Sequence, residues 1–193
     1  MLYKFIEILI SAIVLIPVFV LLNRTMFHNI RKTVLYFVFA VYLAAVYFFV
    51  GMPTLQFMRF EVSLTLVPFL PMVADFKNTI LNIILFVPLG IMLPFLWKKY
   101  NTLKAAAVFG FMMSLSIELL QLFTYRATDI NDLIANTLGT VFGYFLFRMI
   151  SYLVPSVRNV AKRKTEVAAV IVPVILVMFF VQPYLASIFY KIT

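Results

Sequence analysis

The sequence contains no cysteine and a single histidine among its 193 residues. The lack of cysteine excludes disulfide bonds and thiolate metal sites. The single histidine, His28, argues against histidine-based catalysis and against a histidine-rich zinc site. Charge is also scarce, because charged residues make up only 12% of the chain, whereas a soluble domain carries about a quarter.

The sequence is rich in apolar residues. They make up 65% of the chain, and the mean hydropathy is +1.08, which predicts a protein that crosses the membrane several times. A helix needs about 20 apolar residues to cross the hydrocarbon core, and six stretches are long enough: residues 5–22, 33–51, 79–97, 105–123, 131–151 and 167–190. Since a lone strand in lipid leaves its backbone polar groups unpaired, we predict an all-α membrane bundle of about six transmembrane helices, forming one domain over residues 1–193.

The basic residues predict how these helices are oriented. Eleven of the 16 lysine and arginine residues lie in the connections after the first, third and fifth stretches. Cytoplasmic loops carry an excess of lysine and arginine, so both termini are predicted to be extracellular. The first stretch lacks a basic leader and a clear cleavage site, which indicates a retained helix rather than a signal peptide. The net charge of +9 thus reflects membrane orientation, and no nucleic-acid partner is expected.

Acidic residues gather on the opposite side. Of the seven carboxylates, all except Glu166 lie toward the predicted outer face. Acidic residues do not set orientation, so this asymmetry requires another cause. An outward-facing functional site would supply one.

The stretch SIELLQLFTYRATDINDLIANTLG, residues 116–139, contains three of these carboxylates. Here and at the start of the third helix, polar residues recur at spacings of three or four, so each set shares one helix face. The third, fourth and fifth helices thus place polar groups at similar depth, just below the outer surface of the membrane. The candidate site is formed by these sets together with Arg126 on the loop before the fifth helix: Asn78, Asn82, Glu118, Gln121, Arg126, Asp129, Asp132 and Asn136.

Structural explanations compete with a functional one at most of these positions. Asp129 can cap the fifth helix, and Asp75 with Asn78 can cap the third. Asn82 and Asn136 can form hydrogen bonds between helices, worth about 0.6–2 kcal/mol each.

Glu118 is the strongest functional candidate. An ionisable group inside a membrane helix costs about 2.5 kcal/mol or more unless it is paired or hydrated. Arg126 on the neighbouring loop is its expected partner, and a purely structural ion pair between them stays an alternative. Gly139 and Gly143, on the same face as Asp132, are expected to let a neighbouring helix approach closely.

The longest connection covers residues 52–78. Its stretch EVSLTLVPFLP is apolar but too short to span the membrane, and Pro68 and Pro71 interrupt it. We expect a segment near residues 55–72 to lie along the membrane surface or to fold back as a re-entrant lid over the site.

Three stretches between residues 65 and 147 carry a family resemblance: LVPF, NTILNIILFVPLGIMLP and SIELLQLFTYRATDINDLIANTLGTVFGY. Their polar and glycine positions follow the order N-x-x-x-N-x-x-x-F-x-P-x-G, E-x-x-Q, R-x-x-D-x-x-D and N-x-x-G-x-x-x-G. This pattern resembles the VanZ-like family of bacterial membrane proteins, and the peripheral helices near residues 5–22, 33–51 and 167–190 lie outside it. The resemblance implies a location in the bacterial cell membrane. It also implies a link to resistance against teicoplanin and related lipoglycopeptide antibiotics, which act outside the cell.

The first functional hypothesis is that the site binds or modifies an amphiphilic molecule. That molecule would be a membrane lipid, a component of the cell envelope or the lipoglycopeptide itself. The amide side chains of the site would contact it: Asn78, Asn82, Gln121 and Asn136. The sequence makes no prediction of the oligomeric state.

The second hypothesis is an intramembrane hydrolase or transferase that acts on a lipid-linked substrate. Glu118 would be the general base, and Arg126 would stabilise an anionic transition state. Asp129 and Asp132 could join Glu118 around a divalent cation such as Mg²⁺ or Ca²⁺, which prefer oxygen ligands. A transporter or flippase with proline-broken helices is the third hypothesis.

Overall fold

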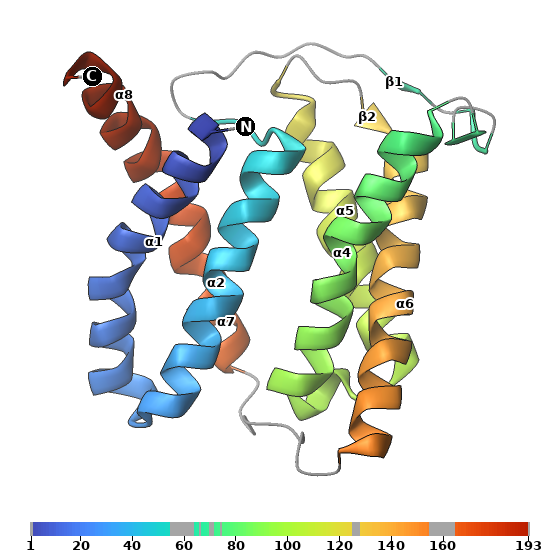
Figure 1. Ribbon diagram of the computed structural model, residues 1–193, viewed down its shortest axis with the longest axis horizontal. Coiled ribbons are helices and arrows are strands. Elements are labelled where there is room, and N and C mark those ends of the chain that lie inside the picture. The colour runs from blue at the N-terminus through green and yellow to red at the C-terminus, as the bar shows by residue number, and fades with distance from the viewer. Residues whose placement is uncertain are drawn as a thin grey trace. The chain divides into compact units, whose positions relative to one another are not determined.

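The computed structural model describes residues 2–54, 64–65, 67–69, 72–73, 75–124, 128–154 and 165–192. Within them, six helices are long and apolar enough to cross a membrane: Phe5–Phe27, Ile30–Val50, Phe76–Leu96, Leu103–Gln121, Ile130–Leu153 and Glu166–Leu185. The predicted all-α, multi-pass bundle is therefore confirmed, and helices dominate the ribbon in Figure 1.

The helices belong to two compact units. The terminal unit comprises Met1–Met58 and Lys164–Thr193, and the central unit comprises Arg59–Arg163. The terminal unit contains α1 (Leu2–Leu22), η1 (Asn23–Phe27), α2 (Ile30–Val50), α7 (Thr165–Leu176), η3 (Val177–Val181) and α8 (Gln182–Ile192). The central unit contains β1 (Leu64–Thr65), α4 (Phe76–Leu96), η2 (Lys98–Tyr100), α5 (Leu103–Gln121), β2 (Thr128–Asp129) and α6 (Ile130–Leu153). The single domain expected over the whole chain stays a prediction.

In the terminal unit, α1 continues into the π-helical turn η1. The first transmembrane helix therefore extends 5 residues past its predicted end at residue 22. Asn23 fixes this turn, because its Oδ1 accepts the Asn29 N–H at 3.0 Å and the Thr33 hydroxyl at 2.8 Å. Asn29 then caps α2 by accepting the Lys32 N–H at 3.1 Å, a role that asparagine favours.

The last transmembrane helix, predicted over residues 167–190, contains a π-helical turn. It is divided into α7, the π-helical turn η3 and α8. Pro183 has no N–H to donate, and its ring opposes a regular helix. Directly before it, the Gln182 N–H bonds the Val177 carbonyl, which is the π-helical pattern. The proline thus explains the irregular turn.

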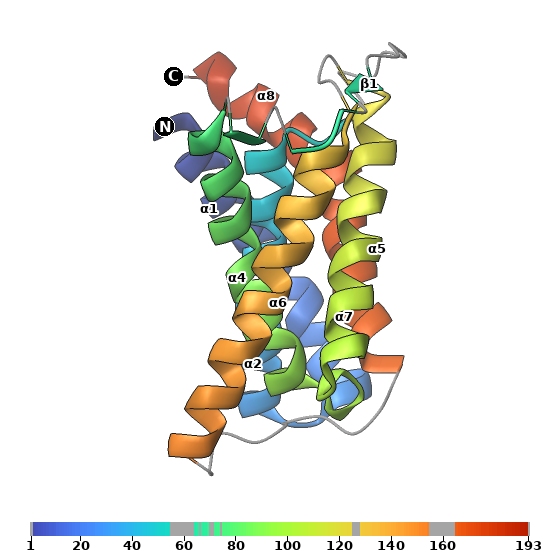
Figure 2. The same cartoon turned by 90° about the vertical axis from the view of Figure 1, so that its right-hand side faces the viewer.

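In the central unit, glycines bring α4 and α6 into close contact. A Cβ atom at Gly90 would lie 2.0 Å from the Thr140 carbonyl oxygen, and one at Gly143 would lie 2.1 Å from the Val87 carbonyl oxygen. Gly139 is confined in the same way. Only a hydrogen atom fits at these positions, so the two backbones touch, as expected for Gly139 and Gly143. Figure 2 shows α4 and α6 side by side.

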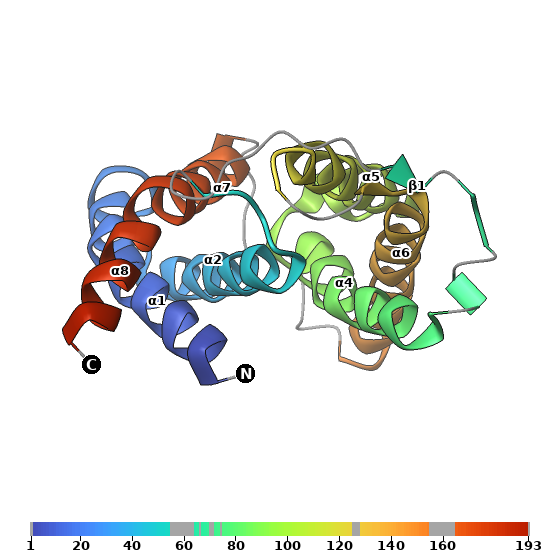
Figure 3. The same cartoon turned by 90° about the horizontal axis from the view of Figure 1, so that it is seen from above.

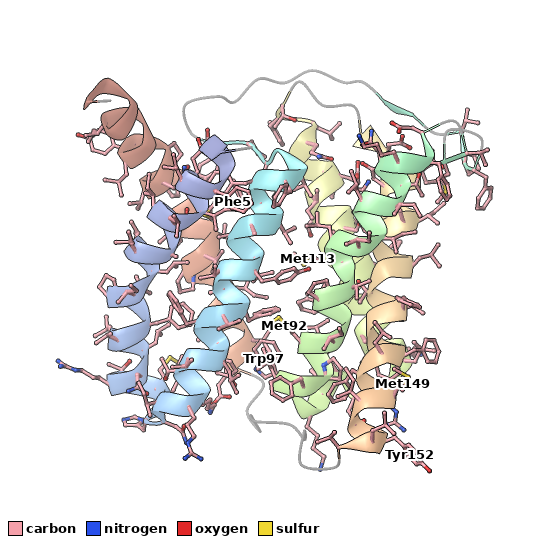
Figure 4. All side chains as sticks on the ribbon, in the orientation of Figure 1. Phe5, Met92, Trp97, Met113, Met149 and Tyr152 are labelled. Atoms are coloured by element: carbon pink, nitrogen blue, oxygen red, sulfur yellow. The ribbon has the colours of Figure 1, made fainter. Side chains whose placement is uncertain are left out.

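α5 packs on the same helix at Gly110, where an added Cβ would lie 2.4 Å from Thr140 Oγ1. Seen end-on in Figure 3, α6 contacts both α4 and α5. The beginnings of α4 and α6 and the end of α5 lie at one end of the unit (Figure 1), which we call the polar end. At the opposite end Trp97 is buried, whereas Tyr152 is 85% exposed and extends from α6 (Figure 4).

Gly143→Ala provides a test of the packing between α4 and α6. The added methyl group would meet the Val87 carbonyl oxygen at 2.1 Å, so the helices must move apart. Overpacking of this kind costs about 1–3 kcal/mol, and we expect a lower thermal unfolding temperature of the purified protein in detergent. Phe142→Ala, at an exposed position of α6, is the control and should unfold near the wild-type temperature. A Gly143→Ala protein as stable as wild type would contradict the close contact.

Candidate functional site

Glu118 lies in the last turn of α5 and is only 3% exposed. Its Oε2 accepts the backbone N–H of Asp129 at 2.8 Å. The carboxylate thus joins the end of α5 to the residue that precedes α6. A buried carboxylate is costly without hydrogen bonds, and an N–H at a helix start is a favourable donor because the positive end of the helix dipole lies there.

Asp129 is the N-cap of α6. Its Oδ1 accepts the backbone N–H of Asn131 at 2.8 Å and the Asn131 side-chain amide at 2.7 Å. The capping role that the sequence left open for Asp129 is therefore confirmed. Its carboxylate is engaged by the first turn of its own helix.

Asn131 ties the segment before α4 to the start of α6. Its side chain is buried, its Oδ1 accepts the Phe69 N–H at 2.8 Å, and its Nδ2 donates to the Val67 carbonyl at 3.0 Å. One amide thus satisfies a donor and an acceptor of the neighbouring backbone. Asn131 was not among the predicted site residues, because helical spacing places it off the face shared by Asp129 and Asp132. Its polarity in the first turn of α6 was the available signal.

A short parallel strand pair extends this contact. β1 pairs with β2, so that Thr65 lies opposite Asp129. We call residues 64–65 and 67–69 the strap. Of the segment predicted near residues 55–72, the structure describes the strap and Met72. The strap lies beside the start of α6. The other residues of the segment lie outside the described part of the chain.

Asn82 and Asp132 connect α4 to α6. The Asn82 Nδ2 donates to the Asp132 Oδ1 at 2.6 Å, and both side chains are partly buried. This is the interhelical hydrogen bond considered from the sequence for Asn82. The bond depends on the close approach of the two helices at their glycines.

Asn136 lies about one turn below Asp132 and is 2% exposed. Its Nδ2 donates to the Ser114 Oγ at 2.9 Å, which joins α6 to α5. Its Oδ1 is buried and has no hydrogen-bond partner within the described residues. A buried acceptor without a donor costs about 1–3 kcal/mol, so a ligand N–H or O–H would be favourable at this oxygen. Ser114 was not predicted, since a lone serine in an apolar helix gives little signal.

These contacts bridge all three helices of the central unit near its polar end. Glu118 and Ser114 connect α5 to the start of α6 and to α6 itself, and Asn82 connects α4 to α6. We call the residues whose side chains make these contacts the polar layer: Asn82, Ser114, Glu118, Asp132 and Asn136.

The remaining predicted residues are placed differently. Asn78 is exposed at the start of α4, where its N–H bonds the Asp75 Oδ1 at 3.3 Å and its side chain also donates to Asp75. The alternative in which Asp75 and Asn78 cap this helix is therefore confirmed. Gln121 is buried at the end of α5. Arg126 lies outside the described residues, so its pairing with Glu118 stays a prediction.

No group of three or more histidine, aspartate or glutamate side chains among the described residues could hold a metal ion. Glu118 is bonded to the backbone before α6, Asp129 to the first turn of α6 and Asp132 to Asn82 on α4. The three carboxylates considered as ligands of Mg²⁺ or Ca²⁺ are therefore not such a group within the described residues.

Comparison with known proteins identifies a family. The family model described as VanZ/LLP1 matches residues 6–151, so the match includes α1 and α2, where the sequence showed no motif. Protein VanZ of Enterococcus faecium is 38% identical over 86 residues, which is 44% of this chain and 52% of that relative. The chain thus spans about half the length of this relative. No solved structure matches the chain.

The hydrogen bond between Asn82 and Asp132 can be measured by a double-mutant cycle. We expect Asn82→Ala and Asp132→Ala to be coupled by about 0.6–2 kcal/mol in unfolding free energy, because each variant removes one partner of the same bond. The measurement is reversible unfolding of the four proteins in detergent. A control cycle of Asp132→Ala with Ser116→Ala, an exposed serine that bonds its own helix at Met112, should show no coupling. Equal values in the two cycles would contradict the bond.

Proposed function

Because the chain belongs to the VanZ/LLP1 family, we propose that it protects bacteria against lipoglycopeptide antibiotics such as teicoplanin. The site would face outward and bind or modify a cell-envelope component or the antibiotic itself. The match to Protein VanZ supports this proposal. The match covers 52% of that relative.

The observation that carries the proposal is the polar layer. Polar groups within membrane helices are costly and usually serve a function, yet five of them lie near one end of a three-helix unit. Structural needs explain the bond between Asn82 and Asp132. They do not explain the Asn136 oxygen, which is buried and has no hydrogen-bond partner within the described residues.

The chemistry of the polar layer favours an amphiphilic ligand. Carboxylate and amide oxygens accept hydrogen bonds from ammonium, amide and hydroxyl groups, which peptide and sugar headgroups carry. The exposed apolar side chains of α4 near the polar end, Ile80, Leu81 and Ile84, would accept a hydrocarbon chain. Arg126 would meet a phosphate or carboxylate of the same molecule.

The strap would control access to this ligand site. Glu118 bonds Asp129, Asp129 bonds Asn131, and Asn131 bonds the backbone of the strap. A ligand that competes for the Glu118 carboxylate would therefore loosen a continuous series of hydrogen bonds that ends at Phe69. In this proposal the strap acts as a lid whose position depends on the state of Glu118.

Binding or acid–base chemistry at Glu118 accounts for the site better than metal catalysis. The hydrolase hypothesis with a divalent cation relies on three convergent carboxylates, and no group of three such side chains among the described residues could hold a metal ion. Acid–base modification would require Glu118 to take up or release a proton while the ligand is bound, whereas binding alone would not.

Substitution of the carboxylates tests the proposed function. Glu118→Gln and Asp132→Asn keep an oxygen acceptor for the Asp129 N–H and the Asn82 amide but remove the negative charge. Each variant should accumulate to wild-type levels in a susceptible bacterial host, and the inhibitory concentration of teicoplanin should fall to that of cells without the protein. Asp75→Asn, at an exposed acid that caps α4, is the control and should protect fully.

Two results would contradict the proposal in different ways. Full protection by both variants at wild-type abundance would show that the two negative charges are not needed for protection and that the polar layer is structural. A wild-type protein that gives no protection against teicoplanin would remove the antibiotic from the proposal.

The orientation can be tested because the chain has no cysteine of its own. Val73→Cys and His28→Cys introduce single thiols at exposed positions in connections that the basic residues assign to opposite sides. We expect a membrane-impermeant maleimide added to intact cells to label Val73→Cys at once and His28→Cys only after the cells are permeabilised. The reverse labelling order would place the polar end in the cytoplasm.

A further inference from the structure

The terminal unit contains an apolar groove that the proposed function does not use. It has a volume of about 280 Å³ and lies between α1, η1 and the beginning of α2. These elements are adjacent in the unit, as Figure 1 shows. Six of the lining side chains are apolar: Ile16, Phe19, Val20, Ile30, Val34 and Phe37.

Two residues of the π-helical turn η1, Asn23 and Arg24, line one end of this groove. A π turn is wider than an α turn and is common at functional sites. Phe27 is turned inward and packs edge-on against Tyr36 with ring centroids 5.0 Å apart, so it does not fill the groove. Asn23 is held by Asn29 and Thr33, which fixes the turn.

The polar residues of the groove all lie at this end. They are Asn23, Arg24 and Thr33. Asn23 and Thr33 satisfy each other, whereas Arg24 is exposed and makes no ion pair within the described part of the chain. The groove therefore combines an apolar floor with a cation at its end.

The neighbouring lysine is not available to neutralise a ligand. Lys32 forms an ion pair with Glu166 of α7. Glu166 is buried and also accepts the Tyr36 hydroxyl at 2.7 Å. Both oxygens of this carboxylate are thus engaged, and the described residues that line the groove include no Asp or Glu. Arg24 is left as the cation that a bound anion would meet.

We propose that this groove binds an anionic phospholipid, with one acyl chain along the apolar side chains and the phosphate on Arg24. The groove belongs to two membrane-spanning helices, so hydrocarbon is the medium around it. Arginine matches phosphate through its planar set of donors. A second copy of the chain fits less well, because a two-fold contact would bring Arg24 and Arg31 of both copies together. This site is independent of the polar layer.

Native mass spectrometry of the purified full-length protein tests the lipid site. The probes are palmitoyl-oleoyl phosphatidylglycerol and palmitoyl-oleoyl phosphatidylcholine, titrated separately in mixed detergent micelles. We expect the first phosphatidylglycerol to bind wild type about fivefold more tightly than the first phosphatidylcholine. One arginine near an anionic headgroup provides an attraction of this size. Arg24→Gln should remove this preference. Val34→Trp, which fills the groove from an exposed position, should weaken the binding of both lipids.

Arg148→Gln is the matched control, because Arg148 is an exposed arginine of α6 that does not line the groove. It should keep the preference for phosphatidylglycerol. Equal loss of that preference in Arg148→Gln and Arg24→Gln would show general attraction to anionic lipid and would overturn the site. So would unchanged lipid binding by a folded Val34→Trp protein, or a concentration-dependent dimer that Val34→Trp disrupts while lipid binding persists.

Discussion

The contact between the α4 and α6 backbones at Gly90, Gly139 and Gly143 sets the geometry of the central unit. Lipid provides no hydrophobic force between helices, so close van der Waals packing and hydrogen bonds must hold them together. Three glycines fix a short separation, and at that separation Asn82 reaches Asp132. The polar layer is therefore a consequence of the packing beneath it.

The polar end satisfies its backbone with the same side chains that form the candidate site. The start of α6 leaves N–H groups without helical partners, and the site residues Glu118 and Asp129 accept two of them. The Asn131 side chain in turn forms hydrogen bonds with the backbone of the strap. Glu118 thus connects the end of α5 to the start of α6, and Asn131 connects the start of α6 to the strap.

The terminal unit treats charge differently. Its buried carboxylate, Glu166, is fully engaged by Lys32 and Tyr36, so this network holds α2 to α7 and leaves nothing for a ligand. The exposed Arg24 lies beside an apolar groove without such a partner. In both units the informative feature is a polar group left over after structural needs are met: the Asn136 oxygen in one and Arg24 in the other.

The sequence by itself determined the membrane class, the six helices and the glycine contact, because apolar length and helical spacing are local properties. It could not separate Asp129 and Asp75, which cap helices, from Asp132 and Glu118, which join them. It also missed Ser114 and Asn131. Only the tertiary structure decided these points, since a hydrogen bond depends on where a side chain from a distant part of the chain comes to lie. The sequence gives the position of a carboxylate but not its partner, so a carboxylate that caps its own helix cannot be told from one that bonds to another helix.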